Sequence, residues 1–234
     1  MKYNSMAVNH AISEQLIDSP MHQAALNGDL VRVKKLVRSN YDIDFKLRNG
    51  DTPIHLAAHA SCIDVVGFLL ESGADANQRN IEGHSPIHFA VFPWFRGYPR
   101  KDDPSLWLEC VKCLVSGGAF IDSTNCFGQT ALHLCARLAD GYGSNVAIIE
   151  YLLESGADVN KQDRDGWSVL HHLYDCDNVG TFQTLLGYGA NPWLKNSEGK
   201  TILDLLDEPK VFDLDDIDLV KQVLRLVPQT DTRN

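Results

Sequence analysis

Residues 52–83 illustrate how polar and apolar positions alternate along the chain. Thr52 is a good helix N-cap, and Pro53 suits the first helical turn, where the missing N–H of proline costs nothing. An apolar run from 63 to 70 supplies the buried face of a second helix, and Gly73 is the type of residue that ends helices. This pattern predicts a pair of short helices followed by a projecting turn.

The same unit recurs along the chain. Its opening motif is a capping residue followed three positions later by a histidine or, in the last copy, an aspartate. Copies begin at Ser19, Thr52, Ser85, Thr130, Ser168 and Thr201. The steps between them are about 33, 33, 45, 38 and 33 residues, so two copies carry insertions, which we place at 92–106 and 139–145. A second motif, an apolar pair followed by glycine and alanine, recurs in phase in four copies and secures the register.

Residues 52–77 resemble the ankyrin repeat family, in which Thr-Pro-Leu-His is followed by two small residues, an apolar pair and Gly-Ala-Asp-x-Asn. The resemblance implies an all-α ankyrin repeat solenoid of about six helix pairs with projecting β-turns, because one pair cannot bury its apolar face alone. We expect an N-terminal capping segment at 1–18, the repeat domain at 19–227 and a tail at 228–234. Helices within 9–18 and 213–227 would cap the stack.

Two copies depart from the family pattern. In the fifth copy Leu173 and Tyr174 replace the two small residues, and in the sixth copy Asp204 replaces the histidine. Small residues at these positions allow close packing of a second helical layer, so we expect the end of the stack to pack irregularly.

Composition restricts the classes of function. The chain is 44% hydrophobic, enough for a core, and its 21 Lys plus Arg against 31 Asp plus Glu give a net charge of -10, opposite to what a nucleic-acid ligand requires. It has no apolar run long enough to span a membrane. Six cysteines in 234 residues indicate reduced thiols rather than a disulfide framework. We expect a monomer without cofactors in the cytoplasm, with the nucleus as a second compartment.

Histidines and cysteines are the candidate metal ligands. The motif histidines are His22, His55, His88, His133 and His171. They recur once per copy and would lie along a stack rather than around a point, and the resemblance implies that each ring binds turn backbone. Cys110 and Cys113 have zinc-ligand spacing, with Cys126 and Cys135 further along. Because Cys110, Cys113 and Cys135 align with apolar or small positions of other copies, we expect no metal site.

The resemblance implies a binding surface made of the turn tips and the inner helices. The candidate partner-binding residues there are Arg48, Asn49, Asp51, Ile81, Glu82, His84, Phe127, Gln129, Arg164, Asp165 and Trp167. Phe127 and Trp167 are the strongest candidates because aromatic side chains are enriched among residues that dominate interface energies. The alternative is that each packs on a neighbouring repeat. Trp94, Phe95 and Tyr98, in the first insertion, either bind a partner or cover local core.

These patterns predict a non-enzymatic protein-interaction module: an adaptor, scaffold or inhibitor. The acidic surface favours a partner with a basic segment. No phosphate loop, nucleophile elbow or other catalytic motif is present. Two alternatives remain open. One is a substrate of a modifying enzyme such as an asparaginyl hydroxylase, since Asn77, Asn160 and Asn191 follow Gly-Ala-Asp or Gly-Ala in turns like those modified in this family. The other is a host-targeted effector that uses the same surface.

Overall fold

A computed structural model describes residues 19–91, 104–137, 145–174, 179–207, 217–225 and 227. The segments expected at 1–18 and 228–234, and most of both insertions, lie outside the described residues. Every regular element in the described segments is a helix, apart from an isolated β-bridge between Gln162 and Ser168. The chain divides into two compact units, Met1–Cys126 and Phe127–Asn234.

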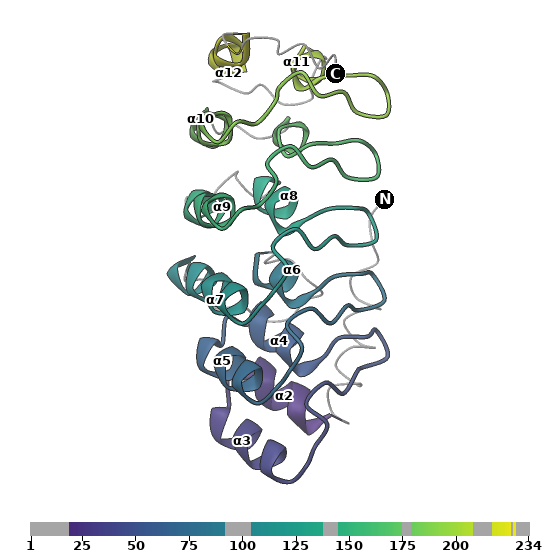
Figure 1. The fold of residues 1–234 in the computed structure, drawn as a ribbon, viewed down its shortest axis with the longest axis vertical. Coiled ribbons are helices and arrows are strands. Elements are labelled where there is room, and N and C mark those ends of the chain that lie inside the picture. Colours follow the sequence, from purple (N-terminus) through teal and green to yellow (C-terminus); the bar gives the residue numbers. More distant parts are fainter. Residues whose placement is uncertain are drawn as a thin grey trace. The chain divides into compact units, whose positions relative to one another are not determined.

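Unit 1 contains three helix pairs among its described residues (Figure 1). The pairs are α2 (Pro20–Leu26) with α3 (Leu30–Arg38), α4 (Pro53–His59) with α5 (Ile63–Glu71), and α6 (Pro86–Val91) with α7 (Pro104–Ser116). The first helices α2, α4 and α6 pack side by side, and the second helices α3, α5 and α7 do the same. The core between the two rows includes Ile54, Val66 and Leu114, all fully buried.

Unit 2 continues the pattern with α8 (Ala131–Ala136), α9 (Asn145–Glu154), the 3-10 helix η1 (His171–Leu173), α10 (Val179–Gly187), α11 (Ile202–Leu206) and α12 (Ile217–Arg225). Helix α8 packs on α9 and on η1, and α10 packs on α9 and on α12. Ile149, Leu152 and Phe182 are almost fully buried between these elements.

The local signals in residues 52–83 act as predicted. Helix α4 begins at Pro53, directly after Thr52, and Ala57 and Ala58 are fully buried against neighbouring helices. Helix α5 ends before Gly73, whose φ of +95° allows the next N–H, that of Ala74, to reach back to the carbonyl of Leu69 at 2.9 Å.

Some boundaries differ from the expected ones. Helix α7 begins at Pro104, inside the insertion predicted at 92–106, because a proline in the first turn of a helix loses no hydrogen bond. Asn145 likewise belongs to α9 rather than to the second insertion. In the fifth copy, where Leu173 and Tyr174 replace the two small residues, the first helix shrinks to the three residues of η1. The predicted end helix at 213–227 is described as α12.

Candidate functional site

The chain between each second helix and the next first helix forms a narrow hairpin, which we call a finger. Unit 1 has fingers at 42–51 and 75–84, and unit 2 has fingers at 158–167 and 191–200; a fifth, at 120–129, contains the boundary between the units. A backbone hydrogen bond closes each of the fingers at 42–51, 75–84, 158–167 and 191–200. In the finger at 75–84 it is the 3.0 Å bond from the N–H of Asn80 to the carbonyl of His84. Fingers therefore hold exposed chain in defined turns.

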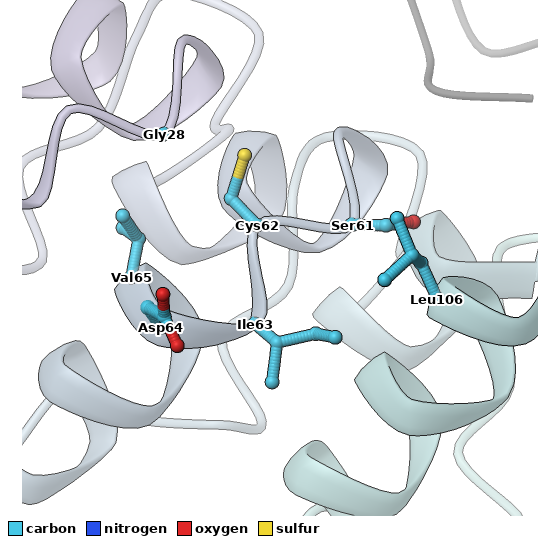
Figure 2. A pocket seen from close by; sticks show the side chains of 7 residues that line it. All are labelled: Gly28, Ser61, Cys62, Ile63, Asp64, Val65 and Leu106. Carbon is cyan, nitrogen blue, oxygen red and sulfur yellow. The ribbon is translucent and has the colours of Figure 1, made fainter. Parts of the chain in front are cut away.

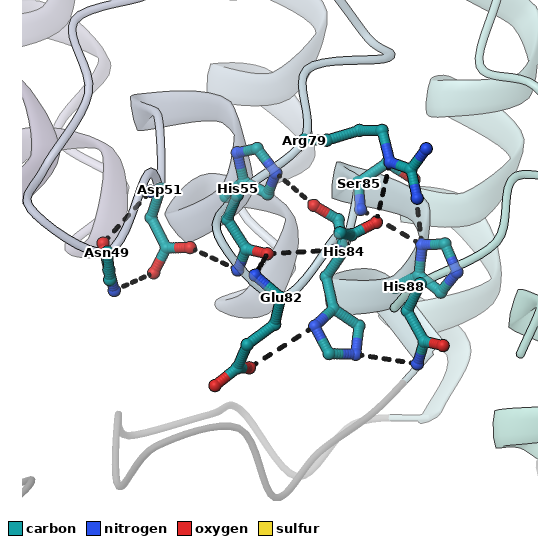
Figure 3. Close-up of polar contacts among 11 residues, drawn as sticks. Asn49, Asp51, His55, Arg79, Glu82, His84, Ser85 and His88 are labelled. Atoms are coloured by element: carbon teal, nitrogen blue, oxygen red, sulfur yellow. Dashed lines mark hydrogen bonds and ion pairs between the residues drawn. The ribbon is translucent and has the colours of Figure 1, made fainter. Parts of the chain in front are cut away.

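The motif histidine ties a first helix to the following finger. His55 accepts the N–H of Thr52 at Nδ1 (3.1 Å). Its Nε2–H donates to the carbonyl of His84 (3.1 Å), as Figure 3 shows. The other bonds of this kind join His22 to Asp51 (3.0 Å), His133 to Lys161 (3.1 Å) and His171 to Lys200 (3.1 Å). The structural role implied for the motif histidines is therefore confirmed for His22, His55, His133 and His171.

Burial keeps these imidazoles neutral. Desolvation lowers the pKa of His22 and of His133 to about 4, and that of His55 to about 3. Because a carbonyl oxygen only accepts, Nε2 carries the proton in each ring, and Nδ1 is the acceptor for the capping residue. The rings are thus fixed in one tautomer. Each ring connects the start of a first helix, through Nδ1, to a backbone carbonyl of the following finger, through Nε2.

Neighbouring fingers are joined at their tips, which we define as the two residues before the finger glycine. In unit 1 the N–H of Ile81 donates to the carbonyl of Asn49 (3.0 Å). Further bonds of this kind run from Cys126 to Glu82 (2.8 Å), Arg164 to Phe127 (2.9 Å) and Ser197 to Asp165 (2.9 Å). Gly83 has a φ of +74°, and a Cβ there would lie 2.9 Å from the backbone nitrogen of Cys126. The tips are therefore closely stacked.

Two predicted surface residues lie behind the tips and are buried. Asp51 is fully buried, and its carboxylate accepts the side-chain amides of Asn49 (2.6 Å) and Asn80 (2.8 Å) (Figure 3). His84 is 5% exposed, and its Nδ1 lies 3.5 Å from the carboxylate of Glu82. The expectation that Asp51 and His84 belong to the exposed surface is wrong, because both side chains face the contacts between fingers.

Trp167 also differs from its expected exposure. Its indole is half-buried and lies 5.4 Å, ring to ring, from both His172 and Tyr174. Its backbone N–H donates to the carboxylate of Asp163 (2.9 Å). The packing alternative therefore describes Trp167, because it ends the fourth copy while His172 and Tyr174 belong to the fifth.

The remaining described candidates are accessible. Ile81 is 72% exposed and Phe127 is 55% exposed. Arg48, Arg164 and Asp165 are exposed, while Asn49, Glu82 and Gln129 are half-buried. Trp94, Phe95 and Tyr98 lie outside the described residues. The tips at 48–49 and 81–82 in unit 1 and at 164–165 in unit 2 thus each present at least one accessible candidate side chain.

The asparagines considered for modification take part in hydrogen bonds between fingers. The amide of Asn77 donates to the carbonyl of Gly118 (2.9 Å) and accepts the N–H of Phe120 (2.7 Å). Asn160 makes the equivalent pair with Gly189 (3.1 Å) and Asn191 (2.7 Å). Asn191 therefore occupies the position of Asp158, not that of Asn160, so the three asparagines are not equivalent.

The cysteines lie where the register places them. Cys110 and Cys135 are fully buried, and Cys113 and Cys126 are half-buried. In the described segments no three His, Cys, Asp or Glu side chains converge in a way that would hold a metal ion.

A hollow of about 290 Å³ lies in unit 1 around the turn before α5 (Figure 2). Its lining residues are Gly28, Ser61, Cys62, Ile63, Asp64, Val65 and Leu106. Ser61 is 2% exposed, has a φ of +52°, and its hydroxyl has no hydrogen-bond partner. None of the lining residues is a cation or an aromatic ring, so a phosphate or a planar ligand would find no matching group there.

Two features were missed from the sequence. One is a buried polar contact in unit 2, in which Nε2 of His172 lies 2.9 Å from the carboxylate of Asp163. The other is Phe120, which is 67% exposed at the base of a finger. Its signal was available: at this position the other fingers have Asp42, Asp75, Asp158 and Asn191.

No helix within the described segments has both the length and the apolar character that crossing a membrane needs.

Curated relatives match parts of the chain. An E3 ubiquitin-protein ligase, Ufd4, from Drosophila melanogaster is 37% identical over 40% of this chain, and the human BCL-6 corepressor-like protein 1 is 36% identical over 40% of it. The matched regions make up only 3% and 5% of those two proteins. The chain therefore corresponds to a small part of these much longer relatives.

The fold and the family model agree over most of the chain. A crystal structure of an ankyrin repeat domain from Acinetobacter baumannii AYE matches with a TM-score of 0.70 and 25% identity, covering 88% of this chain and 96% of that one. The family model for ankyrin repeats (three copies) matches residues 21–93 and 106–203. With the bonding of the motif histidines and the stacked helix pairs, these matches show that the chain belongs to the ankyrin repeat family.

Proposed function

We propose that this chain is an adaptor, scaffold or inhibitor that binds a partner protein through the tips of its fingers. Ankyrin repeats are generally protein–protein interaction modules and are typically non-enzymatic. The similarity to a corepressor-like protein supports a role in binding, although it involves only part of that protein.

One observation carries the proposal: large apolar side chains are held exposed on turns whose backbone is fixed. Ile81 is 72% exposed, yet its N–H is bonded to Asn49 and the finger behind it is anchored by Asp51 and His55. A preorganised apolar side chain loses little conformational entropy on binding, which favours affinity. The net charge of -10 favours a partner that contributes basic residues at the rim of such a contact.

The test is affinity capture from native lysate, comparing the wild type with an Ile81→Ala, Phe127→Ala double variant. A Val31→Ala variant is the matched control, because Val31 is 80% exposed but lies on helix α3, away from any finger tip. We expect the control to recover the same dominant partner as the wild type, and the double variant to recover at least tenfold less. Equal recovery by a folded double variant would contradict the proposal.

A further inference from the structure

The base of the finger at 120–129 differs from the bases of the other fingers. In the other fingers, a side-chain oxygen of the first residue accepts the N–H of the residue two positions later, which forms an Asx turn. These bonds are Asp42 with Asp44 (3.0 Å), Asp75 with Asn77 (2.8 Å), Asp158 with Asn160 (2.9 Å) and Asn191 with Trp193 (2.9 Å). Phe120 has no such oxygen, although its carbonyl still accepts the N–H of Ser123 (3.1 Å). The turn therefore does not require the aromatic ring.

The ring of Phe120 lies at the surface beside a hollow. It is 67% exposed and borders a space of about 590 Å³. The other lining residues are Asn77, Arg79, Ile121, Asp122, Ser123 and Thr124. A single exposed apolar residue is ordinary, but this one replaces a stabilising local hydrogen bond and stands next to a second apolar side chain, Ile121, in a concave place. This combination favours an intermolecular role for the ring.

The walls of the hollow are preformed by contacts between two adjacent fingers. Asn77 bridges them by accepting the N–H of Phe120 (2.7 Å) and donating to the carbonyl of Gly118 (2.9 Å). Arg79 donates through Nε to the carbonyl of Gly83 (3.1 Å) and through Nη2 to that of Thr124. A partner would therefore meet a shaped surface that needs little ordering.

Carboxylates continue from the hollow along the bases of the preceding fingers. Asp75 lies two residues before Asn77, and its backbone N–H donates to the carboxylate of Asp44 (3.3 Å), which in turn lies two residues after Asp42. Burial, together with the charges of Asp75 and Asp42, raises the pKa of Asp44. This row of like charges produces a negative potential that attracts cationic side chains.

We propose that the hollow beside Phe120 docks a segment of a partner protein in which an apolar side chain is flanked by lysine or arginine residues. The apolar side chain packs against Phe120 and Ile121, and the cations lie along Asp75, Asp44 and Asp42. The inference rests on the proposed function as an interaction module, but it uses the base of the fingers and not their tips.

The test uses the full chain and a synthetic nine-residue peptide with a central leucine and four lysines, labelled for fluorescence anisotropy. We expect saturable binding at low salt, with amide chemical-shift changes concentrated at residues 75–79 and 120–124. A matched peptide with glutamates in place of the lysines should bind at least tenfold more weakly.

Two variants separate the apolar and the charged contributions. Phe120→Asn supplies the Asx-turn oxygen found in the other fingers, so it should weaken peptide binding about tenfold while the thermal midpoint stays equal or rises. The Asp42→Asn, Asp75→Asn double variant retains both turn oxygens but removes two charges. It should weaken binding about fivefold at low salt, and this difference should fade at high salt.

Several results would overturn the inference: unchanged affinity in Phe120→Asn, equal binding of the acidic peptide, or shift changes away from the hollow. Self-association of the wild type that Phe120→Asn abolishes would identify a second copy as the occupant instead. The Ile81→Ala, Phe127→Ala variant should bind the peptide normally. Suppose that the Ile81→Ala, Phe127→Ala variant no longer captures the partner and that the wild type does not bind the peptide. This pair of results would reject the docking site beside Phe120 but would leave the proposed function of the finger tips intact.

Discussion

The finger tips and the residues directly behind them differ in burial although they alternate along the same short hairpins. In the finger at 75–84, Ile81 is 72% exposed, whereas His84, three residues later, is 5% exposed. In the finger at 42–51 the buried residue is the carboxylate of Asp51. Polarity thus does not decide exposure here: a charged side chain is inside and an aliphatic one is outside.

The difference teaches that a finger has two separable parts. The buried part, which includes Asp51 and Asn80 and is bonded to His55 of α4, consists of hydrogen-bonded groups whose removal leaves an unsatisfied partner inside the protein. The exposed part makes backbone bonds to its neighbours, while its side chains are accessible. Substitutions behind the tips should therefore change the free energy of unfolding, and substitutions at the tips should change binding.

The largest expected effect is from His55→Ala. The change removes a fully buried ring, takes away one of the two donors to the carbonyl of His84, the other being the N–H of Asn80, and leaves the N–H of Thr52 without its acceptor. We expect the free energy of unfolding to fall by about 4 kcal/mol in urea titrations. Val31→Ala is the control and should change it by less than about 0.5 kcal/mol. If His55→Ala lowers the free energy of unfolding by less than about 1 kcal/mol, the hydrogen bonds of the His55 ring are not needed for stability.

Acid should weaken the buried part without any mutation. The pKa of His22 is lowered to about 4 and that of His55 to about 3 in the folded chain, so below about pH 6.5 the unfolded state binds more protons. The stabilisation that the two neutral rings give to the folded state is complete above about pH 6.5, and it is lost as the pH falls toward 4. At pH 5.5 the two rings together should lower the free energy of unfolding by about 3 kcal/mol relative to pH 7.5.

Urea titrations across this pH range measure the effect, and His55→Gln provides the control. Removing one titrating ring should reduce the slope of unfolding free energy against pH by up to about one proton. A flat profile between pH 7.5 and 5.5 in the wild type would argue against neutral, buried rings.

The contact between neighbouring tips can be tested with a pair of glycines in unit 2. Gly166 and Gly199 have φ values of +73° and +77°, but a Cβ on Gly166 would lie 2.8 Å from the nitrogen of Ser197, while one on Gly199 would meet nothing within 4 Å. We expect Gly166→Ala to cost about 2.5 kcal/mol and Gly199→Ala about 1 kcal/mol, the latter from backbone strain alone. Equal losses in thermal or urea unfolding would mean that the stacking of tips does not constrain the turn.

The smallest effects concern the two aromatic residues near the tips of unit 2. Trp167 packs on His172 and Tyr174, so Trp167→Ala should lower the free energy of unfolding by about 2 kcal/mol. Phe127 is 55% exposed, so Phe127→Ala should lower it by less than about 0.5 kcal/mol. Urea unfolding of the two variants side by side checks this order, and the reverse order would invalidate the division between the two parts.

The sequence was sufficient for features that depend on nearby residues. Thr52 and Pro53 are adjacent, so the start of α4 follows from local rules, whereas the bonding role of His55 was implied by the family resemblance. The replacement of the two small residues by Leu173 and Tyr174 marked the fifth copy as irregular, but it did not indicate that the first helix would shorten to η1.

Features that depend on distant residues could not be predicted in this way. Asp51 looked like a surface residue because its partner, Asn80, lies 29 positions further along in the next finger. Trp167 is a different case: its partner His172 is nearby in the chain, but it stands where α4 has the aliphatic Leu56, so the pattern of the other copies gave no sign of this contact. Phe120 directly follows the Gly-Ala of the second motif, so its signal lies in one position outside that motif, where the other fingers have Asp or Asn.

The most direct test of the account measures two quantities on one protein, the Ile81→Ala, Phe127→Ala variant. Its dissociation constant for the partner captured by the wild type should rise at least tenfold, while its free energy of unfolding stays within about 1 kcal/mol of the wild type. An unchanged dissociation constant in a variant of unchanged stability would contradict the central claim that the exposed tips recognise the partner.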